Sequence, residues 1–357
     1  MRWYSDDNHP RTPTAMNDLL NYVAAASNTT FDAIPIIDLH GGVLQDPEQR
    51  ASVAKEIRDA CINVGFFYVS NHGVDLTLIA DVVGQAKRFF DLPSAEKMEL
   101  DIHKSDNFKG YTALLGENTD PENRGDLHEG FDIGWEELVR SAEARPHNTE
   151  PSSDSGLVQG GNVWPNAELL PGFREALLKY YHAVIALGKT LFTIFALALG
   201  LNENFFDDKV TKPAAIMRLL HYPPQTGVFD ERVIGIGAHT DYECFTILWQ
   251  DDVPALQVLN NEGRWIDAKP IPGTFVINLG DQFARWTNDI FKSTTHRAIN
   301  RTGVRRYSMP LFFGTDYDVK LEAIPSCVSA ERPPRYEVVT AGEYVKSRLE
   351  ATYAHSK

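Results

Sequence analysis

The chain has 357 residues, of which 43% are hydrophobic and 23% charged, a balance typical of a globular protein with a sizeable core. Its formal net charge of −15 disfavours nucleic acid as a partner, because a negative field repels phosphate backbones. The three cysteines, Cys61, Cys244 and Cys327, lack paired spacing, which argues against a disulfide framework or a zinc cluster and predicts a reducing, cytoplasmic setting.

The first half of the chain alternates short strands and helices. Residues 1–30 are polar, contain no apolar signal core, and are expected to form an N-terminal arm. The region 31–212 follows, and in it the hydrophobic periodicity predicts several elements. These are strands at 34–39 and 66–69, helices at 47–63 and 76–90, and a helix that begins at Pro93-Ser94 with Ser94 as its cap.

The segment 104–161 is rich in Gly, Asn, Asp, Glu and Pro and shows no sustained period. A long irregular stretch of this kind is more often functional than idle, so we expect it to cover the mouth of a site. A long helix is predicted from Phe173 to about Leu201. Its apolar part could span a bilayer by length, but Lys189 near its middle favours a core helix, and we expect no membrane association.

From Ala214 onward the pattern changes to short strands with turn residues between them. Eight strands at this spacing predict a sandwich or jelly roll over residues 213–316, followed by a C-terminal helical extension, 317–357, with a helix at 343–351. The predicted strands are 215–222, 234–239, 245–249, 256–259, 264–267, 274–278, 294–299 and 306–313.

A metal site is indicated by His239-Thr240-Asp241 and the distant His296. Residues i and i+2 of a strand point to the same face, so His239 and Asp241 converge and need a third ligand from elsewhere. Two His and one carboxylate suit Fe(II) and leave three positions open for small molecules. Ordinary, partly buried histidines are the alternative for such residues in isolation.

Further motifs occur around these residues in a set order. The whole set resembles the Fe(II)/2-oxoglutarate-dependent oxygenases related to isopenicillin N synthase, over about residues 34–316. The resemblance implies a mixed α/β fold with a mainly β core, a double-stranded β-helix (jelly roll) flanked by helices. The motifs are Ile34–Leu39, Gly65–Val74, His239-Thr-Asp241, Trp265–Asp267, Pro272–Asp281, Asn288-Asp289, His296-Arg297 and Arg306-x-Ser308.

The same resemblance implies Fe(II) as cofactor, 2-oxoglutarate and O2 as co-substrates, and His239, Asp241 and His296 as the metal ligands. Arg306 offers a planar fork for the far carboxylate of 2-oxoglutarate, and Ser308 adds a hydroxyl on the same face of its strand. Tyr222 matches a position that often adds a phenol. The alternatives are a surface salt bridge for Arg306 and a core aromatic for Tyr222.

The substrate residues are less defined. Phe312 matches a position that often faces the substrate, and Arg218 shares the facing of Tyr222 and could reach an acidic substrate group. Tyr111 and Phe131 lie in or beside the irregular segment. Each of these four residues could equally belong to the core or the surface. Near the metal, Asn278 and Asp281 could either support the ligands or form a turn, and His128 is expected to be structural.

The predicted function is an oxygenase that oxidises an unactivated C–H bond of a small organic molecule and releases succinate and CO2. Hydroxylation is the default outcome, and desaturation or ring rearrangement remain open. The alternatives are a 2-oxoglutarate-independent Fe(II) oxidase, an ethylene-forming enzyme and a non-catalytic small-molecule binder. Many relatives have Gly two residues after the ligand Asp, whereas Tyr242-Glu243 follows here, and this departure favours a microbial branch. A nucleobase, an amino-acid derivative and a secondary metabolite all fit, and the oligomeric state stays open.

Overall fold

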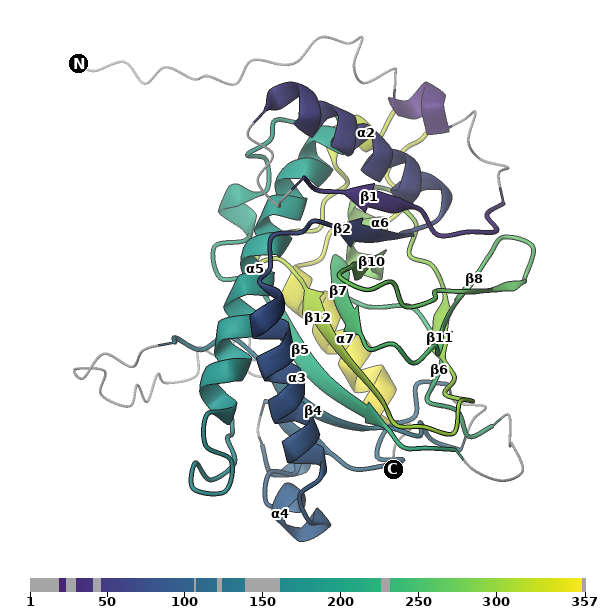
Figure 1. Ribbon diagram of the computed structural model, residues 1–357. Helices are drawn as coiled ribbons and strands as arrows, with labels where there is room; N and C mark the ends of the chain where they lie inside the picture. Colours follow the sequence, from purple (N-terminus) through teal and green to yellow (C-terminus); the bar gives the residue numbers. More distant parts are fainter. Residues whose placement is uncertain are drawn as a thin grey trace, which may run out of the picture.

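The structure, a computed structural model, describes residues 19–23, 30–40, 46–105, 107–120, 124–138, 161–225 and 232–354, the last six of these by their backbone only. Two β-sheets face each other, and helices cover the outer face of the larger sheet (Figure 1). The α-helices are α2 (Pro47–Asn63), α3 (Leu76–Phe90), α4 (Ser94–Met98), α5 (Phe173–Ala198), α6 (Asp281–Trp286) and α7 (Ala341–Ala354).

The large sheet has eight strands, which come from both halves of the chain. Apart from the parallel pair at its β1 edge, every neighbouring pair in it is antiparallel. In spatial order the strands are β1 (Ile36–Asp38), β2 (Phe66–Ser70), β10 (Phe275–Leu279), β7 (Phe245–Gln250), β12 (Arg306–Phe313), β5 (Ala215–Tyr222), β4 (Glu129–Ile133) and β3 (Gly110–Thr112).

The small sheet has four antiparallel strands and contains two of the predicted metal ligands. His296 of β11 lies directly opposite His239 of β6, which brings together residues 57 positions apart in the chain. The order is β6 (Ile236–His239), β11 (His296–Ala298), β8 (Leu256–Leu259) and β9 (Trp265–Asp267). Together the two sheets form the predicted jelly roll.

The main hydrophobic core lies between the large sheet and the helices α2, α3 and α5. Gly188 in the middle of α5 allows the close approach, because a Cβ atom there would overlap the ring of Phe313 on β12. In the described part of the chain, α5 alone is long and apolar enough to cross a membrane, and most of its apolar window is buried against these neighbours. This packing is the one expected of a core helix.

Most predicted elements are confirmed within one or two residues, and α2, α3, β5, β8 and β12 have the predicted bounds. Asp46 and Asp75 accept hydrogen bonds from Glu48 N and Thr77 N and so cap α2 and α3. The prediction for Ser94 was wrong: Pro93 occupies the N-cap of α4, and Ser94 is already its first helical residue.

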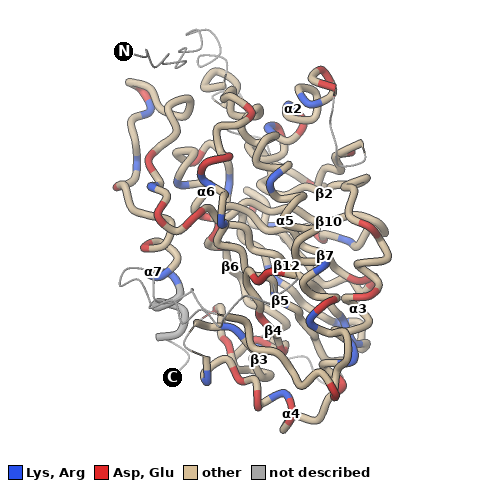
Figure 2. The backbone as a smooth tube through the Cα atoms, turned by 90° about the vertical axis from the view of Figure 1, so that its left-hand side faces the viewer, with Lys and Arg blue, Asp and Glu red and all other residues tan. Residues whose placement is uncertain are grey.

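The segment 104–161 is only partly irregular. It contributes β3 and β4, which extend the large sheet beyond β5 and were not predicted. Residues 106, 121–123 and 139–160 lie outside the described part of the chain, as does most of the predicted arm 1–30. Acidic and basic residues are interspersed along the loops and helices of the molecule rather than separated by sign (Figure 2).

Candidate functional site

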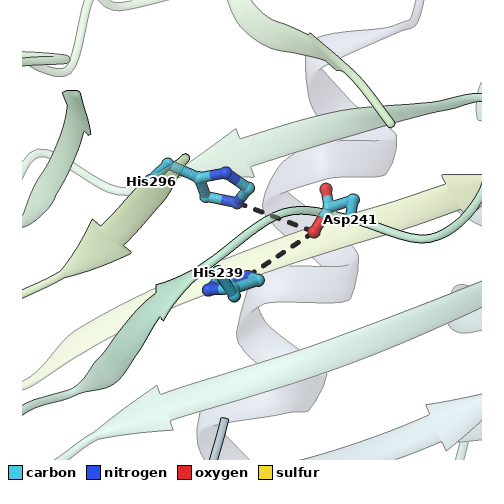
Figure 3. Close-up of side chains that lie close together, drawn as sticks. All are labelled: His239, Asp241 and His296. Atoms are coloured by element: carbon cyan, nitrogen blue, oxygen red, sulfur yellow. Dashed lines mark ion pairs between the residues drawn. The ribbon is translucent and has the colours of Figure 1, made fainter. Parts of the chain in front are cut away.

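His239, Asp241 and His296 converge at one point (Figure 3), and their ligand atoms all lie within 4.8 Å of one another. The Nε2 atoms of His239 and His296 lie 3.5 Å and 3.6 Å from Asp241 Oδ1. The Nδ1 atom of His239 is hydrogen-bonded to the carbonyl oxygen of Gly237 (2.8 Å), and that of His296 to the carbonyl oxygen of Thr294 (3.1 Å). Both imidazoles therefore turn Nε2 toward the shared point, as metal ligands do when a second hydrogen bond sets their tautomer.

The Asp241 carboxylate is oriented from the opposite side. Its Oδ2 accepts hydrogen bonds from Asn278 Nδ2 (2.6 Å) and from the Thr246 hydroxyl, on β10 and β7 of the large sheet. The other oxygen, Oδ1, faces the two imidazoles. Two neutral nitrogens and one carboxylate oxygen, each supported by an outer hydrogen bond, form a donor set that fits Fe(II).

Electrostatics favour the metal-binding forms of Asp241 and His296, whereas at His239 burial is outweighed by the Asp241 carboxylate, which raises the pKa of this imidazole. Burial alone would raise the pKa of Asp241, but the His296 and His239 rings and the Thr246 hydroxyl outweigh it and lower this pKa. Burial lowers the pKa of His296 to about 4, and the neighbouring His239 adds to this effect. A neutral imidazole beside an ionised carboxylate is the combination that binds a divalent metal at neutral pH.

Arg306 on β12 is almost completely buried, with 1% of its surface exposed, and its guanidinium lies over the ring of Tyr222 at 4.7 Å. It donates long hydrogen bonds to Val253 O (3.3 Å), Gln250 Oε1 (3.3 Å) and Ser308 Oγ (3.4 Å). No carboxylate in the described part of the chain forms an ion pair with it. A buried guanidinium without an ion-pair partner is poised to bind an anion.

One cavity of about 210 Å³ connects the metal cluster with Arg306. Even-numbered residues of β5 and β12 face it, because side chains alternate between the faces of a strand. Beyond the triad, its lining residues include Tyr222, Ser308, Phe312, Arg218, Glu117, Asp132, His128, Tyr242, Glu243 and Tyr317. Six residues of the predicted covering segment 104–161 are part of the lining: Asn107, Phe108, Glu117, Thr119, His128 and Asp132.

Arg218 lines the cavity together with Tyr222, as the sequence predicts, but it is not available to an acidic substrate. Its Nε and Nη2 donate to Asp132 (2.7 and 2.6 Å), and its Nη1 and Nη2 donate to Glu117 (2.7 and 3.0 Å). Two carboxylates thus surround one guanidinium. The predicted role of Arg218 as an anchor for a substrate anion is therefore corrected.

Tyr111 and Phe131 point away from the cavity, into the core beneath the helices. In the strand register, Tyr111 pairs with Phe131 and Phe131 pairs with Leu219, whose side chain lies on the opposite face of β5 from Arg218. The Tyr111 hydroxyl donates to Glu129 (2.6 Å), and Phe131 is fully buried. The prediction that these two residues contact the substrate was wrong, because the pairing register puts them on the other side of the sheet.

Several site residues carried no decisive sequence signal. Thr246 orients Asp241 across two strands, Asn278 supports the same carboxylate, and Glu243 lines the cavity. Asp281 accepts from Thr240 Oγ1 (3.1 Å) and Ser293 Oγ (2.6 Å) and so ties the metal loop to the segment before β11. Asn288 and Asp289, with φ of 54° and 61°, form a turn, and neither is among the residues that line the cavity.

Comparison with known proteins gives two family matches. Residues 34–167 match the N-terminal family described as non-haem dioxygenase in morphine synthesis. Residues 213–315 match the 2OG-Fe(II) oxygenase superfamily. The second match spans the strands that carry the triad, Arg306 and Ser308.

Individual relatives are similar over almost the whole chain. The 2-oxoglutarate-Fe(II) type oxidoreductase hxnY of Emericella nidulans is 37% identical, with 91% of this chain and 92% of the relative covered. The homoarginine-6-hydroxylase 2-ODD-233 of Oryza sativa subsp. japonica is 34% identical, with 89% and 97% covered. Among solved structures, a full-length Neurospora crassa protein in complex with alpha-KG and thymine superimposes with a TM-score of 0.78 at 31% identity, covering 90% of this chain and 97% of that one.

Proposed function

Because this chain belongs to the 2OG-Fe(II) oxygenase superfamily, we propose that it hydroxylates a C–H bond of a small organic molecule bound in the cavity beside His239, Asp241 and His296. Dependence on Fe(II) and 2-oxoglutarate follows from the family. One observation carries the proposal: a single cavity is lined both by the three-ligand cluster and by a buried arginine with no ion-pair partner in the described part of the chain.

Each residue has a defined task in this proposal. His239, Asp241 and His296 hold the iron, while Asn278 and Thr246 keep the Asp241 carboxylate turned toward it. When bound, the iron supplies the oxidising chemistry together with O2 and 2-oxoglutarate, and the protein supplies position and exclusion of water.

The far carboxylate of 2-oxoglutarate is assigned to the opposite end of the cavity. The Arg306 guanidinium binds it, and the hydroxyls of Ser308 and Tyr222, 3.5 Å apart, complete the pocket. The long hydrogen bonds that Arg306 makes to neutral groups are readily exchanged for short ones to a carboxylate.

Hydroxylation of a small molecule is supported by the named relatives. One is a homoarginine-6-hydroxylase, and the Neurospora crassa structure contains thymine beside alpha-KG. We also propose that the protein works in a reducing, cytoplasmic setting without nucleic-acid or membrane partners. The buried free thiols of Cys61, Cys244 and Cys327 support the reducing setting.

The proposal is tested by anaerobic titration of metal-free protein with Fe(II) and then 2-oxoglutarate, following the visible charge-transfer band of the chelate. We expect a band in wild-type protein. Arg306→Ala should weaken 2-oxoglutarate binding at least about 100-fold, the cost of two hydrogen bonds to a charged group. Arg305→Ala is the matched control. Arg305 precedes Arg306 in the chain, but its exposed side chain pairs with Asp91 outside the cavity. The affinity of this variant for 2-oxoglutarate should therefore stay at the wild-type value.

Three results would contradict this assignment. Iron binding without a band would indicate an oxidase that does not use 2-oxoglutarate. Ethylene in the headspace, with 2-oxoglutarate consumed and no substrate oxidised, would indicate an ethylene-forming enzyme. A protein that binds no iron would be a small-molecule binder of the same fold.

A further inference from the structure

The two ends of the cavity differ in the charge that they present. In the strand pairing Arg306 lies opposite Tyr222 and Phe312 lies opposite Ile216, so the 2-oxoglutarate anchor and Phe312 stand six residues apart. Six residues of a strand span about 20 Å. The end of the cavity around Phe312 is therefore left for the substrate, and its side chains decide which substrate fits.

Glu243 belongs to this substrate end. Cys244 N donates to Phe313 O (3.1 Å), and a Cβ atom added to Gly314 would lie 3.6 Å from Glu243 Cγ. These contacts place Glu243 beside the end of β12. Apart from its own backbone amide, no donor in the described part of the chain pairs with the Glu243 carboxylate, although the side chain is at most partly exposed. It therefore presents an acceptor to the cavity.

The Arg218 cluster adds acidity on the neighbouring wall. Arg218 and its partners Glu117 and Asp132 carry one positive and two negative formal charges, and all three line the cavity. Together with Glu243, this cluster holds three carboxyl groups beside one guanidinium. An anionic substrate would meet this field unfavourably, whereas a cation would be attracted by it.

His128 supplies an independent sign of an absent donor. Its side chain is 98% buried and lines the same cavity, and Nδ1 is bound to the carbonyl oxygen of Gly235 at 2.8 Å. Nε2 lies 3.4 Å from Glu117 Oε2 but is not aligned for a hydrogen bond with any described residue. A buried polar nitrogen of this kind is expected to find a partner, and an N–H group of a ligand would provide one.

We propose that the substrate carries a positively charged nitrogen, an amine or a guanidine, and that Glu243 is the residue that selects it. The inference rests on the proposed function, because it assigns the substrate class of the same cavity. Phe312 and Tyr317 line this end as well, and their ring faces are suited to a cation.

The test uses the anaerobic Fe(II)–2-oxoglutarate complex and follows the change of its visible band as a second ligand binds. Two sets of matched probes are titrated: benzylamine, benzyl alcohol and benzoate, and butylamine, butanol and butanoate. In at least one set we expect the amine to bind at least about tenfold more tightly than the alcohol, and the carboxylate most weakly. One hydrogen bond to a charged group accounts for such a factor.

Glu243→Gln should lower the affinity for the amine at least about tenfold while the affinity for the alcohol changes less than about twofold. Glu243→Asp keeps the charge and should restore part of the preference, and Glu322→Gln, at an exposed position, is the control. The proposal is overturned if neither amine binds more tightly than its alcohol, if a carboxylate binds best, or if Glu243→Gln keeps the wild-type preference. Absence of the band itself would overturn the proposed function and this inference with it.

Discussion

The strands β4 and β5 carry a buried charge network on each of their two faces, and the two networks differ in their ratio of acids to cations. On the helix side, the Glu129 carboxylate accepts from Lys97 Nζ (2.6 Å) and the Tyr111 hydroxyl (2.6 Å) and pairs with His221 Nδ1 (2.7 Å). One carboxylate there has three partners. On the cavity side, Arg218 is shared between two carboxylates.

The comparison separates a closed network from an open one. The helix-side network satisfies its single acid from within the core, so it stabilises a particular packing of α4, β3, β4 and β5. The cavity-side network shares one guanidinium between two carboxylates and lines the cavity, so a bound ligand can contact it. Neighbours in sequence belong to different networks, since His128 and Glu129 alternate across the sheet. We expect substitutions on the cavity side to change ligand binding and activity, and those on the helix side to change the free energy of unfolding.

The largest effect is expected on the cavity side, for His296→Ala. Substitution of residues that merely support a metal ligand costs about 10–100-fold in affinity or activity, so removal of a ligand should lower succinate formation at least about 1000-fold. The melting temperature of the metal-free protein should change little. His103→Ala, an exposed histidine, is the control. Succinate formed at the wild-type rate by His296→Ala would remove this residue from the metal site.

On the helix side, Lys97→Met should destabilise the protein by about 3 kcal/mol, because it leaves the Glu129 carboxylate buried without its cation. Chemical denaturation measures the loss. Lys104→Met changes a nearby exposed lysine in the same way and should stay within about 0.5 kcal/mol of wild type. If the two variants had equal stability, the closed network would not contribute to the fold.

The smallest expected effect is a pH dependence of the same network. Burial acts to raise the pKa of Glu129, but hydrogen bonds from His221, Lys97 and Tyr111 outweigh it and lower this pKa below its ordinary value of 4.5. A lowered folded-state pKa adds stability that is present above the unfolded-state pKa and is lost as pH falls through the folded one.

The difference in unfolding free energy between wild type and Glu129→Gln should therefore shrink as pH falls below about 4.5. Glu322→Gln, which removes an exposed carboxylate, is the control and should show no such change with pH. A difference that stayed constant down to about pH 3 would show that the ionised form of Glu129 is not what the network stabilises.

Local sequence patterns predicted much of the architecture. Apolar periodicity predicts α2 and α3 with the observed bounds, and turn residues separate the eight strands of the jelly roll. The i, i+2 rule also predicted that His239 and Asp241 converge and that Arg306 and Ser308 share a face. These features depend on residues close together in the chain, where the geometry of a strand or helix decides the outcome.

Tertiary pairing decided the rest. Because of the register of β3 with β4 and of β4 with β5, Tyr111 and Phe131 face the core, although other residues of the same segment line the cavity. Period-2 alternation predicts only that neighbours face opposite ways; which face is the cavity depends on the partner strand.

Partners far apart in the chain account for what the cavity contains. The facing of Arg218 follows from the sequence, but its two carboxylates come from positions 101 and 86 residues away. Asn278 reaches Asp241 across 37 residues. The metal-binding and 2-oxoglutarate motifs could be recognised from the sequence alone, because the facing of residues i and i+2 on a strand is a local property. The two carboxylate partners of Arg218, and the lack of an ion-pair partner for Glu243 in the described part of the chain, became visible only in the folded molecule, because charge pairing depends on which strands meet.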